Sequence, residues 1–323
     1  MAPLSAAELL ALSETDVTVR LTPEQFLPAL SQAPFVNIEG TFNARDIGKL
    51  PASTASPSAG TVRPGFVFRS GMLARLTDRG KATLASDLGI RRVFDFRSQS
   101  EHAQAPDPTP ADSVTLVWQE TAEETPHVWL EPFAEGFGEA GFAQTYLDVL
   151  RAYRPTVKHL LEHVRDRPEE PFLFHCTGKN CFPLLTPRCT GSPTDLLAGR
   201  DRTGVLAALL LTLAGAAPDT IALDYMLSRI GSEPVRDELE KFARMGAGVP
   251  ERKPDDSPEA IAAAVAATPP GFLNLINLRV VCWNAFLEAL DKEHGGFEGY
   301  VTKTLGFSDG DVATIKKNLT TAP

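Results

Sequence analysis

The sequence predicts an α/β fold with a central, mostly parallel sheet flanked by helices. The first observation is a regular strand–helix–strand unit over residues 67–96, because a strand that returns through a helix pairs in parallel. The second is a short apolar segment, residues 172–174, followed later by a long apolar helical segment, residues 203–213. The third is a composition typical of globular proteins, with 43% hydrophobic and 22% charged residues.

Charge and hydropathy narrow the class of function. The formal net charge is −10, which argues against general nucleic-acid binding but leaves room for a local basic pocket. No apolar stretch approaches the roughly 18 uncharged residues of a membrane span, so we expect no membrane span. The first residues, MAPLSAAELLALSETDV, lack the basic start of a signal peptide, and four cysteines in 323 residues do not make a disulfide scaffold. We therefore expect a reducing, cytoplasmic setting.

The first part of the chain, residues 1–34, is expected to be a helical lead-in to one domain over residues 35–323. Thr22 can cap a helix that begins at Pro23. The lead-in is thus predicted to hold two short helices.

Residues 35–49 are predicted to form a strand followed by a polar turn. Asn43, Arg45 and Asp46 lie close together in that turn. We interpret them as an Asx-type turn with a local ion pair.

The strand–helix–strand unit begins with a strand over residues 67–70, and Thr77 can cap the helix that follows. A second strand, residues 90–96, completes the unit. Polar residues at the carboxyl ends of parallel strands line the ligand crevice. Asp95 and Arg97 are therefore expected either near the functional site or in a structural ion pair.

The remaining elements follow from apolar periodicity and cap residues. A further strand is expected over residues 114–118, followed by an acidic loop over 119–140. The charged segment 232–256 is broken by Gly and Pro, and it is expected to be an exposed connection or a lid. Helices are expected at residues 142–153, 156–164, 218–230, 257–267, 272–290 and 309–319.

The residues that can carry chemistry lie after strand 172–174 and before helix 203–213. Cys176 near a helix N-terminus and an arginine would be a thiolate nucleophile. Arg202 can bind an oxyanion through two parallel hydrogen bonds, and Asp201 can act as a general acid. These are the groups needed for phosphoryl transfer to sulfur.

The spacing of these residues does not fit a tight phosphate cradle. Twenty-five residues separate Cys176 from Arg202. Without the twenty residues 178–197, the sequence reads HCTAGRDRTG, and five residues separate the cysteine from the arginine.

In this joined form the segment resembles the HCxxGKDRTG loop of the atypical protein-tyrosine phosphatases of bacteria and fungi. Four further segments are similar to that family in the expected order, and the resemblance covers about residues 35–320. It implies a cysteine-dependent phosphatase fold that uses no metal and no cofactor. The segments are TFNARDIGKL, RPGFVFRSGMLARLTDRGKATLASDLGIRRVFDFRSQSE, DYMLS and GGFEGYVTKTLGFSD.

The resemblance also implies a role for each residue of the loop. Cys176 would form a phosphocysteine, Arg202 would bind the phosphoryl oxygens and Asp201 would be the general acid. Thr203 would donate a hydrogen bond to the thiolate as it leaves. The loop residues that would bind substrate are Thr177, Ala198, Gly199, Arg200 and Thr203, the middle three through backbone N–H groups.

The resemblance favours hydrolysis of phosphotyrosine in a phosphorylated protein. Small phosphate monoesters would also be substrates. Dual specificity toward phosphoserine and phosphothreonine, or activity on phosphoinositides, is the close alternative. Arg200 stands where the family usually has Lys, and that Lys accompanies phosphoinositide activity in some members. The departure disfavours phosphoinositides. A third hypothesis, a thiol-based sulfurtransferase, would not explain the sequence Asp-Arg-Thr-Gly over residues 201–204.

Residues 178–197 allow two interpretations. The first is a retained intron, because the signature is restored when they are removed and Gly178-Lys179 can be encoded by a splice-donor sequence. The second is a genuine insertion, which would make the chain a non-catalytic pseudo-phosphatase or phosphate-binding protein. Cys181 and Cys189 do not have the spacing of a zinc knuckle. With the segment present, we expect weak or no catalysis.

Overall fold

The computed structural model describes most of the chain. The described residues are 3–53, 55–56, 58–123, 129–176, 199–246, 249, 259, 263 and 265–323. The expected helix over 257–267 and the loop residues Thr177 and Ala198 lie largely or wholly outside them.

The described residues contain one five-stranded sheet, which confirms the predicted mostly parallel architecture. The strand order is β1-β2-β5-β3-β4, and only β1 runs antiparallel to its neighbour. β5 lies in the middle of the sheet, as expected for a short segment that is apolar throughout. The strands are β1 (Arg45–Asp46), β2 (Val67–Ser70), β3 (Arg92–Asp95), β4 (Thr115–Trp118) and β5 (Phe172–His175).

The register brings the carboxyl ends of the three central strands to one edge of the sheet. Ser70 of β2 and Asp95 of β3 are both paired with His175 of β5. The next residue, Cys176, therefore leaves the sheet at the edge where parallel α/β proteins bind ligands.

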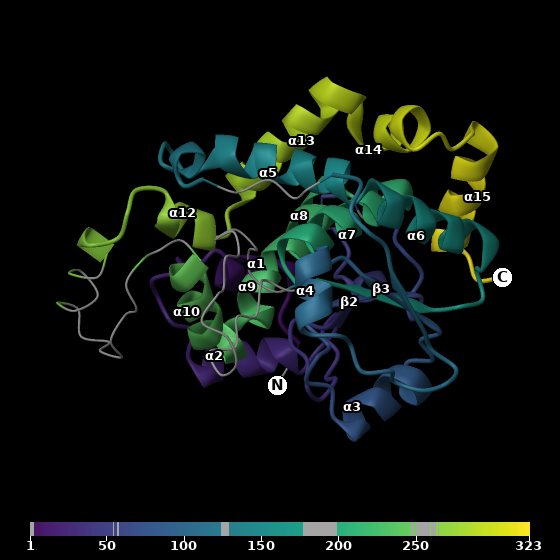
Figure 1. Cartoon of the computed structure of the whole chain (residues 1–323), viewed down its shortest axis with the longest axis horizontal. Coiled ribbons are helices and arrows are strands. Elements are labelled where there is room, and N and C mark those ends of the chain that lie inside the picture. The colour runs from purple at the N-terminus through teal and green to yellow at the C-terminus, as the bar shows by residue number, and fades with distance from the viewer. Residues whose placement is uncertain are drawn as a thin grey trace.

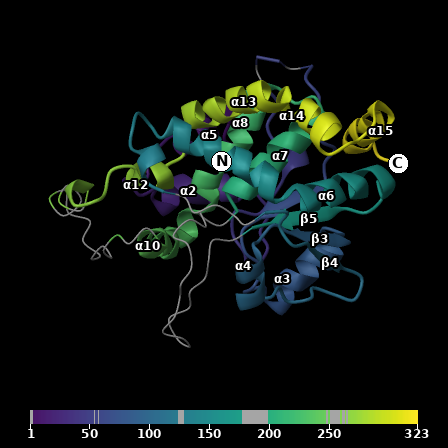
Figure 2. The same cartoon turned by 45° about the horizontal axis from the view of Figure 1, so that its top comes forward.

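Helices cover both faces of the sheet. α3 lies on one side, and α6, α7 and α15 lie on the other (Figures 1 and 2). The longer helices are α1 (Ala6–Ser13), α2 (Pro23–Leu30), α5 (Glu139–Ala152), α6 (Arg154–Asp166), α7 (Asp201–Leu213), α8 (Pro218–Met226), α10 (Arg236–Gly246), α13 (Val280–His294) and α15 (Asp309–Thr320). The shorter ones are α3 (Asp78–Ala82), α4 (Gln99–Gln104), α9 (Ser228–Gly231), α12 (Phe272–Ile276) and α14 (Gly296–Gly299).

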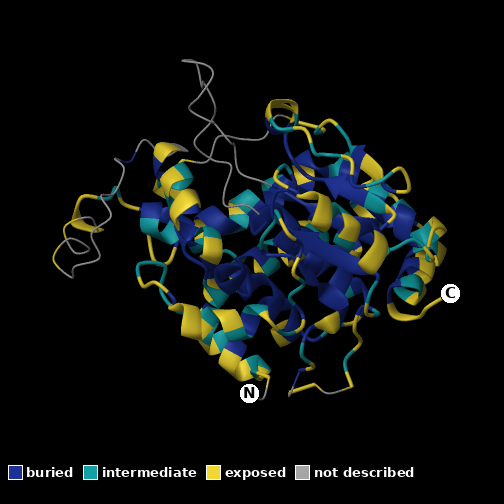
Figure 3. Cartoon of the chain, turned by 90° about the horizontal axis from the view of Figure 1, so that it is seen from below, coloured by how far each residue is buried: buried dark blue, intermediate teal, exposed yellow. Residues whose placement is uncertain are grey.

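Alternating side chains of the strands fill two apolar cores. Phe172 and Phe174 of β5 belong to the larger core, which includes residues of α5, α6 and α7. Leu173 belongs to the smaller core on the opposite face. This is the two-residue period of a strand whose two faces are both covered. β1, β2, β5 and almost all of α7 are buried, whereas the edge strand β4 has exposed residues (Figure 3).

Helix α7 is buried along almost its whole length, which explains its uniformly apolar sequence. It packs between β2 and the helices α5, α8 and α15. It ends before Gly215, whose φ of 81° is the left-handed conformation that glycine adopts most easily at a helix end. The helical segment predicted over residues 203–213 ends at the same residue as α7.

The lead-in contains the two predicted helices, and α2 begins at Pro23 with Thr22 in a capping box. α1 and α2 pack against α8 and α9. Leu9 of α1 belongs to the larger core.

The single helix predicted over residues 272–290 is wrong, because the structure has two helices there, α12 and α13. The backbone of Asn277 between them is extended, and its side chain donates a hydrogen bond to Asp16 at 2.9 Å. Asn277 Oδ1 also accepts the backbone N–H of Leu278 at 3.0 Å, and local side-chain-to-backbone hydrogen bonds of this kind compete with helix continuation. No helix among the described residues is long and apolar enough to cross a membrane.

Candidate active site

Cys176 and Arg202 lie together at the carboxyl edge of the sheet. Cys176 follows β5 directly and is fully buried, and Arg202 is in the first turn of α7. Burial by itself would lower the pKa of Arg202. Nearby acidic groups outweigh this effect and hold its pKa well above the ordinary value, and Cys176 is one of these groups. The thiol of Cys176 therefore lies close enough to a permanently charged guanidinium to interact with it electrostatically.

Glu101 fixes the orientation of the Arg202 guanidinium. Nη1 donates to Glu101 Oε2 at 2.6 Å, and Nη2 donates to Oε1 at 2.9 Å. Nη1 also donates to the carbonyl of Phe96 at 2.9 Å and to the hydroxyl of Tyr153 at 3.0 Å. A forked arginine–carboxylate pair is geometrically strict, so it holds the plane of the guanidinium in one position.

Glu101 is itself positioned by a capping box at the start of α4. The backbone N–H of Ser98 donates to Glu101 Oε2 at 2.6 Å, and the Ser98 hydroxyl caps the backbone N–H of Glu101. The sequence Ser-x-x-Glu after a strand is the signal of such a box. The sequence contained this signal, but the contact between Glu101 and Arg202 was not predicted from it.

Gly199 forms the turn that leads into α7. Its φ is 77°, and a Cβ atom there would lie 2.7 Å from the carbonyl oxygen of Ser70. Its carbonyl accepts hydrogen bonds from Asn43 Nδ2 at 2.7 Å and from Arg69 Nη2 at 3.0 Å. A residue with a side chain would therefore clash with the backbone at this position, and the hydrogen bonds to the Gly199 carbonyl hold the turn in its present conformation.

Arg69 connects that turn to a buried carboxylate. Its Nη2 also donates to Thr203 Oγ1 at 2.7 Å, and its Nη1 pairs with Asp224. Arg45 Nε donates to the other oxygen of Asp224 at 2.7 Å. Burial would raise the pKa of Asp224, but the two arginines hold it below the ordinary value.

The contacts of Arg45 correct one prediction and refine another. The local ion pair expected between Arg45 and Asp46 is wrong, because Arg45 pairs with Asp224 of α8. Asp46 does form the expected turn, since its Oδ1 accepts the backbone N–H of Gly48 at 2.9 Å.

Asp201 lies between a cation and a hydroxyl. Arg200 Nε donates to both carboxylate oxygens, at 3.0 and 3.1 Å. The hydroxyl of Tyr146, on α5, donates to Asp201 Oδ1 at 2.7 Å. The sequence pointed to Asp201 but gave no sign of Tyr146, which lies 55 residues away in the chain.

The side chain of Arg200 is turned toward the segment after α12. It donates to the carbonyls of Leu275 at 3.0 Å, Ile276 at 3.1 Å and Asn277 at 3.4 Å. Together with the pair to Asp201, these hydrogen bonds hold the Arg200 guanidinium in the interior of the protein. These contacts also explain why the chain is extended at Asn277.

A cysteine at the end of a central strand, an arginine in the first turn of a buried helix and a glycine turn directly before that helix are groups that can bind an oxyanion. A sequence model described as the tyrosine phosphatase family matches residues 36–180 and 197–321. The chain belongs to the tyrosine phosphatase family. It is accordingly a hydrolase of phosphate monoesters.

Two curated relatives extend this similarity over nearly the full chain. A tyrosine-protein phosphatase of Nostoc commune is 27% identical over 98% of this chain and 97% of its own length. The triple specificity protein phosphatase PtpB of Mycobacterium tuberculosis is 27% identical over 86% of this chain and 96% of its own length. The family match leaves residues 181–196 unmatched.

The predicted phosphatase residues that are described gather at one place. Cys176, Asp201, Arg202 and Thr203 are buried at the start of α7 or beside it. Gly199 and Arg200 precede them in the turn. Thr177 and Ala198 lie outside the described residues. The side chains that the sequence analysis did not assign to the site are Asn43, Arg69, Glu101, Tyr146 and Tyr153.

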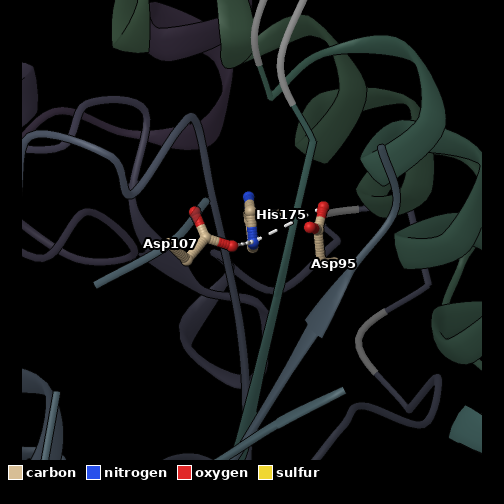
Figure 4. A group of neighbouring side chains, drawn as sticks. All are labelled: Asp95, Asp107 and His175. Atoms are coloured by element: carbon tan, nitrogen blue, oxygen red, sulfur yellow. Dashed lines mark ion pairs between the residues drawn. The ribbon is translucent and has the colours of Figure 1, made fainter. Parts of the chain in front are cut away.

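Asp95, Asp107 and His175 form a polar cluster beside the active site (Figure 4). Their ligand atoms lie within 4.8 Å of one another, and His175 Nε2 is 2.8 Å from Asp107 Oδ2. Arg97 also pairs with Asp95 at 2.8 Å and with Asp107 at 2.8 Å. A metal would have to displace this guanidinium, so the donor set does not favour one. The structural ion pair expected for Asp95 and Arg97 is confirmed.

Replacing Asp95 by Asn is expected to lower the free energy of unfolding by about 2 kcal/mol at pH 7. Burial would raise the pKa of Asp95, but His175, Arg97 and His102 outweigh it and lower the pKa to about 2. Because the folded-state pKa is below the unfolded value, the stabilisation is present above about pH 4 and is lost between about pH 4 and 2. Urea unfolding at a series of pH values measures it.

The control is Asp78→Asn, because Asp78 is fully exposed and its pair with Lys81 lies at the surface. Because Asp78 is exposed at the start of α3, Asp78→Asn should lower the free energy of unfolding by less than about 1 kcal/mol. A pH-independent loss in Asp95→Asn, or a loss no greater than in the control, would contradict the assignment.

Proposed function

We propose that the chain is a protein-tyrosine phosphatase that works through a phosphocysteine. The contact network that fixes Arg202 beside Cys176 carries this proposal, because it pre-orients a cation for the phosphoryl oxygens next to the nucleophile. Substrates would be phosphorylated proteins or small phosphate monoesters. The free state of Cys176 and Cys282 fits a cytoplasmic setting.

In the proposed reaction, Cys176 Sγ attacks phosphorus and forms the S–P bond while the ester O–P bond breaks. Asp201 gives its proton to the leaving oxygen. Arg202 and the backbone N–H groups of Thr177, Ala198, Gly199 and Arg200 hold the transferred oxygens. Water then attacks the phosphocysteine, Asp201 takes back a proton, and inorganic phosphate and the free thiolate result.

Thr203 would stabilise the thiolate when phosphate leaves. Its hydroxyl oxygen accepts a hydrogen bond from Arg69, so its own hydrogen is directed to another acceptor. We propose that this acceptor is the sulfur of Cys176.

The position of Arg200 supports phosphotyrosine over phosphoinositides. Its guanidinium is bound to Asp201 and to three carbonyls after α12, so it does not extend to a second phosphate of a substrate. Phosphotyrosine also has a better leaving group than phosphoserine, because a phenol is more acidic than an alcohol.

The substrate assignment is tested with two peptides of one sequence that carry phosphotyrosine or phosphoserine, and with a phosphoinositide in mixed micelles. We expect kcat/KM to be at least about tenfold higher for the phosphotyrosine peptide than for either other substrate. Equal values for both peptides would indicate dual specificity. A preference for the phosphoinositide would overturn the assignment.

We also propose that residues 35–323 form the phosphatase domain and that residues 1–34 pack against it. Residues 178–197 would have no role in catalysis. The gap in the family match at residues 181–196 supports this, since the match resumes directly before the second half of the loop.

A further inference from the structure

Two buried tyrosine hydroxyls form a chain that ends on Asp201. Tyr146 donates to Asp201 Oδ1 at 2.7 Å, and the oxygen atoms of Tyr146 and Tyr225 are 2.6 Å apart. Both residues are almost fully buried, Tyr146 on α5 and Tyr225 on α8. Elements far apart in the sequence thus converge on one carboxylate.

The hydrogen count fixes the direction of this chain. A tyrosine hydroxyl has one hydrogen to donate. Tyr146 gives its hydrogen to Asp201, so Tyr225 must supply the hydrogen between the two hydroxyls. If Tyr146 turned away from Asp201, the short contact with Tyr225 would need both residues to rearrange. Tyr225 therefore keeps Tyr146 in the donor role.

Both hydroxyls keep their protons over the range in which enzymes work. Burial raises the pKa of Tyr146 well above the ordinary value, and the charge of Asp201 adds to this. Burial likewise raises the pKa of Tyr225. The two tyrosines act as hydrogen-bond donors and do not transfer protons themselves.

We infer that Tyr146 is a positioning residue that makes Asp201 Oδ1 an acceptor and so places the acid proton on Oδ2. Oδ1 accepts hydrogen bonds from both Tyr146 and Arg200, whereas Oδ2 accepts only from Arg200 and keeps a lone pair for the proton. One of the two carboxyl protonation states is thereby selected before substrate binds. The inference rests on the proposed role of Asp201 as the general acid.

The packing around Tyr146 allows the hydroxyl to be removed without disturbing the ring. The ring meets Phe286 edge-on, with centroids 5.4 Å apart, and it also contacts Trp283. Tyr146→Phe keeps these contacts and removes only the hydrogen bonds. Tyr300→Phe is the matched control, because its buried hydroxyl donates to the backbone carbonyl of Leu150 at 2.6 Å and not to Asp201.

The test compares kcat/KM for p-nitrophenyl phosphate with that for phenyl phosphate, in whichever chain form is more active, with or without residues 178–197. kcat/KM reports the transfer of phosphate to Cys176. The p-nitrophenolate group leaves with little need of a proton, whereas the phenolate group needs general acid assistance. We expect Tyr146→Phe to lower kcat/KM for phenyl phosphate by about tenfold and to change that for p-nitrophenyl phosphate much less.

Further variants separate this inference from the proposed function. Asp201→Asn should show the same substrate pattern more strongly, and adding Tyr146→Phe to it should cause no further selective loss. Tyr225→Phe should show the pattern more weakly. Tyr300→Phe should affect both substrates equally or not at all.

Three different outcomes would contradict the role of Asp201, the role of Tyr146 or the proposed phosphatase function, and the assays distinguish them. If Asp201→Asn lowers both substrates equally, the general-acid role of Asp201 is wrong, and the inference falls with it. If Asp201→Asn is selective but Tyr146→Phe is not, only the role of Tyr146 is wrong. If neither chain form hydrolyses either ester, the proposed function itself is wrong. A fall in the unfolding temperature of Tyr146→Phe no greater than that of Tyr300→Phe confirms that the variant is folded.

Discussion

Replacing Cys176 by Ser is expected to lower kcat toward p-nitrophenyl phosphate by at least about 10,000-fold. A serine hydroxyl beside Arg202 has no thiolate to offer, because its pKa lies far above that of a thiol. The oxyanion-binding part of the site remains. The variant should therefore still bind a phosphotyrosine peptide, which equilibrium binding of a labelled peptide measures.

The matched control is Cys282→Ser. Cys282 is the other free cysteine among the described residues, and it is buried on α13, where its Sγ donates to the carbonyl of Phe137. This variant should keep the parent kcat. Retention of activity in Cys176→Ser, or equal losses in both variants, would rule out the phosphocysteine route.

Removing residues 178–197 is expected to raise kcat/KM toward p-nitrophenyl phosphate by about 100-fold or more relative to the full chain. The deletion joins Thr177 directly to Ala198, and the backbone N–H groups of both then belong to one short loop. Displacement of catalytic groups by about 1 Å can cost that factor in rate. Parallel assays of the two purified forms measure the ratio.

A second variant tests whether the effect comes from the loop length. It keeps all 323 residues but carries Cys181→Ser and Cys189→Ser, which excludes unwanted thiol chemistry as the cause. It should behave like the full chain. Equal activity of the full chain and the deletion form would show that residues 178–197 are compatible with catalysis. Sequencing the transcript across the codons of Cys176 and Arg202 tests the retained-intron interpretation directly.

Local signals were sufficient for most elements of the sheet. β2, β4 and β5 lie within one residue of the predicted ranges, because short apolar segments bounded by turns have few other conformations. The helix predicted over residues 272–290 failed for the opposite reason. Arg200 and Asp16, both distant in the chain, bind the groups around Asn277 and interrupt it.

The candidate loop residues were predicted from their types and order and from the family resemblance. The residues that orient them were not, because their contacts span large distances in the sequence. Glu101 reaches Arg202 across 101 positions, and Arg69 reaches Thr203 across 134. A capping glutamate and an arginine in a strand have ordinary local explanations, so no local pattern marks them as parts of a site.

The sequence alone determined the class of the protein: a mostly parallel α/β sheet, a cysteine after the central strand and an arginine at the start of the buried helix. These features depend on local periodicity and on the chemistry of a few side chains. The tertiary structure decided how the site is held. Whether Arg45 pairs with Asp46 or with Asp224, and whether Asp201 meets Tyr146, depends on which helices pack over the sheet. Buried polar groups must find partners wherever the fold brings them, and those partners are set by packing rather than by neighbours in the chain.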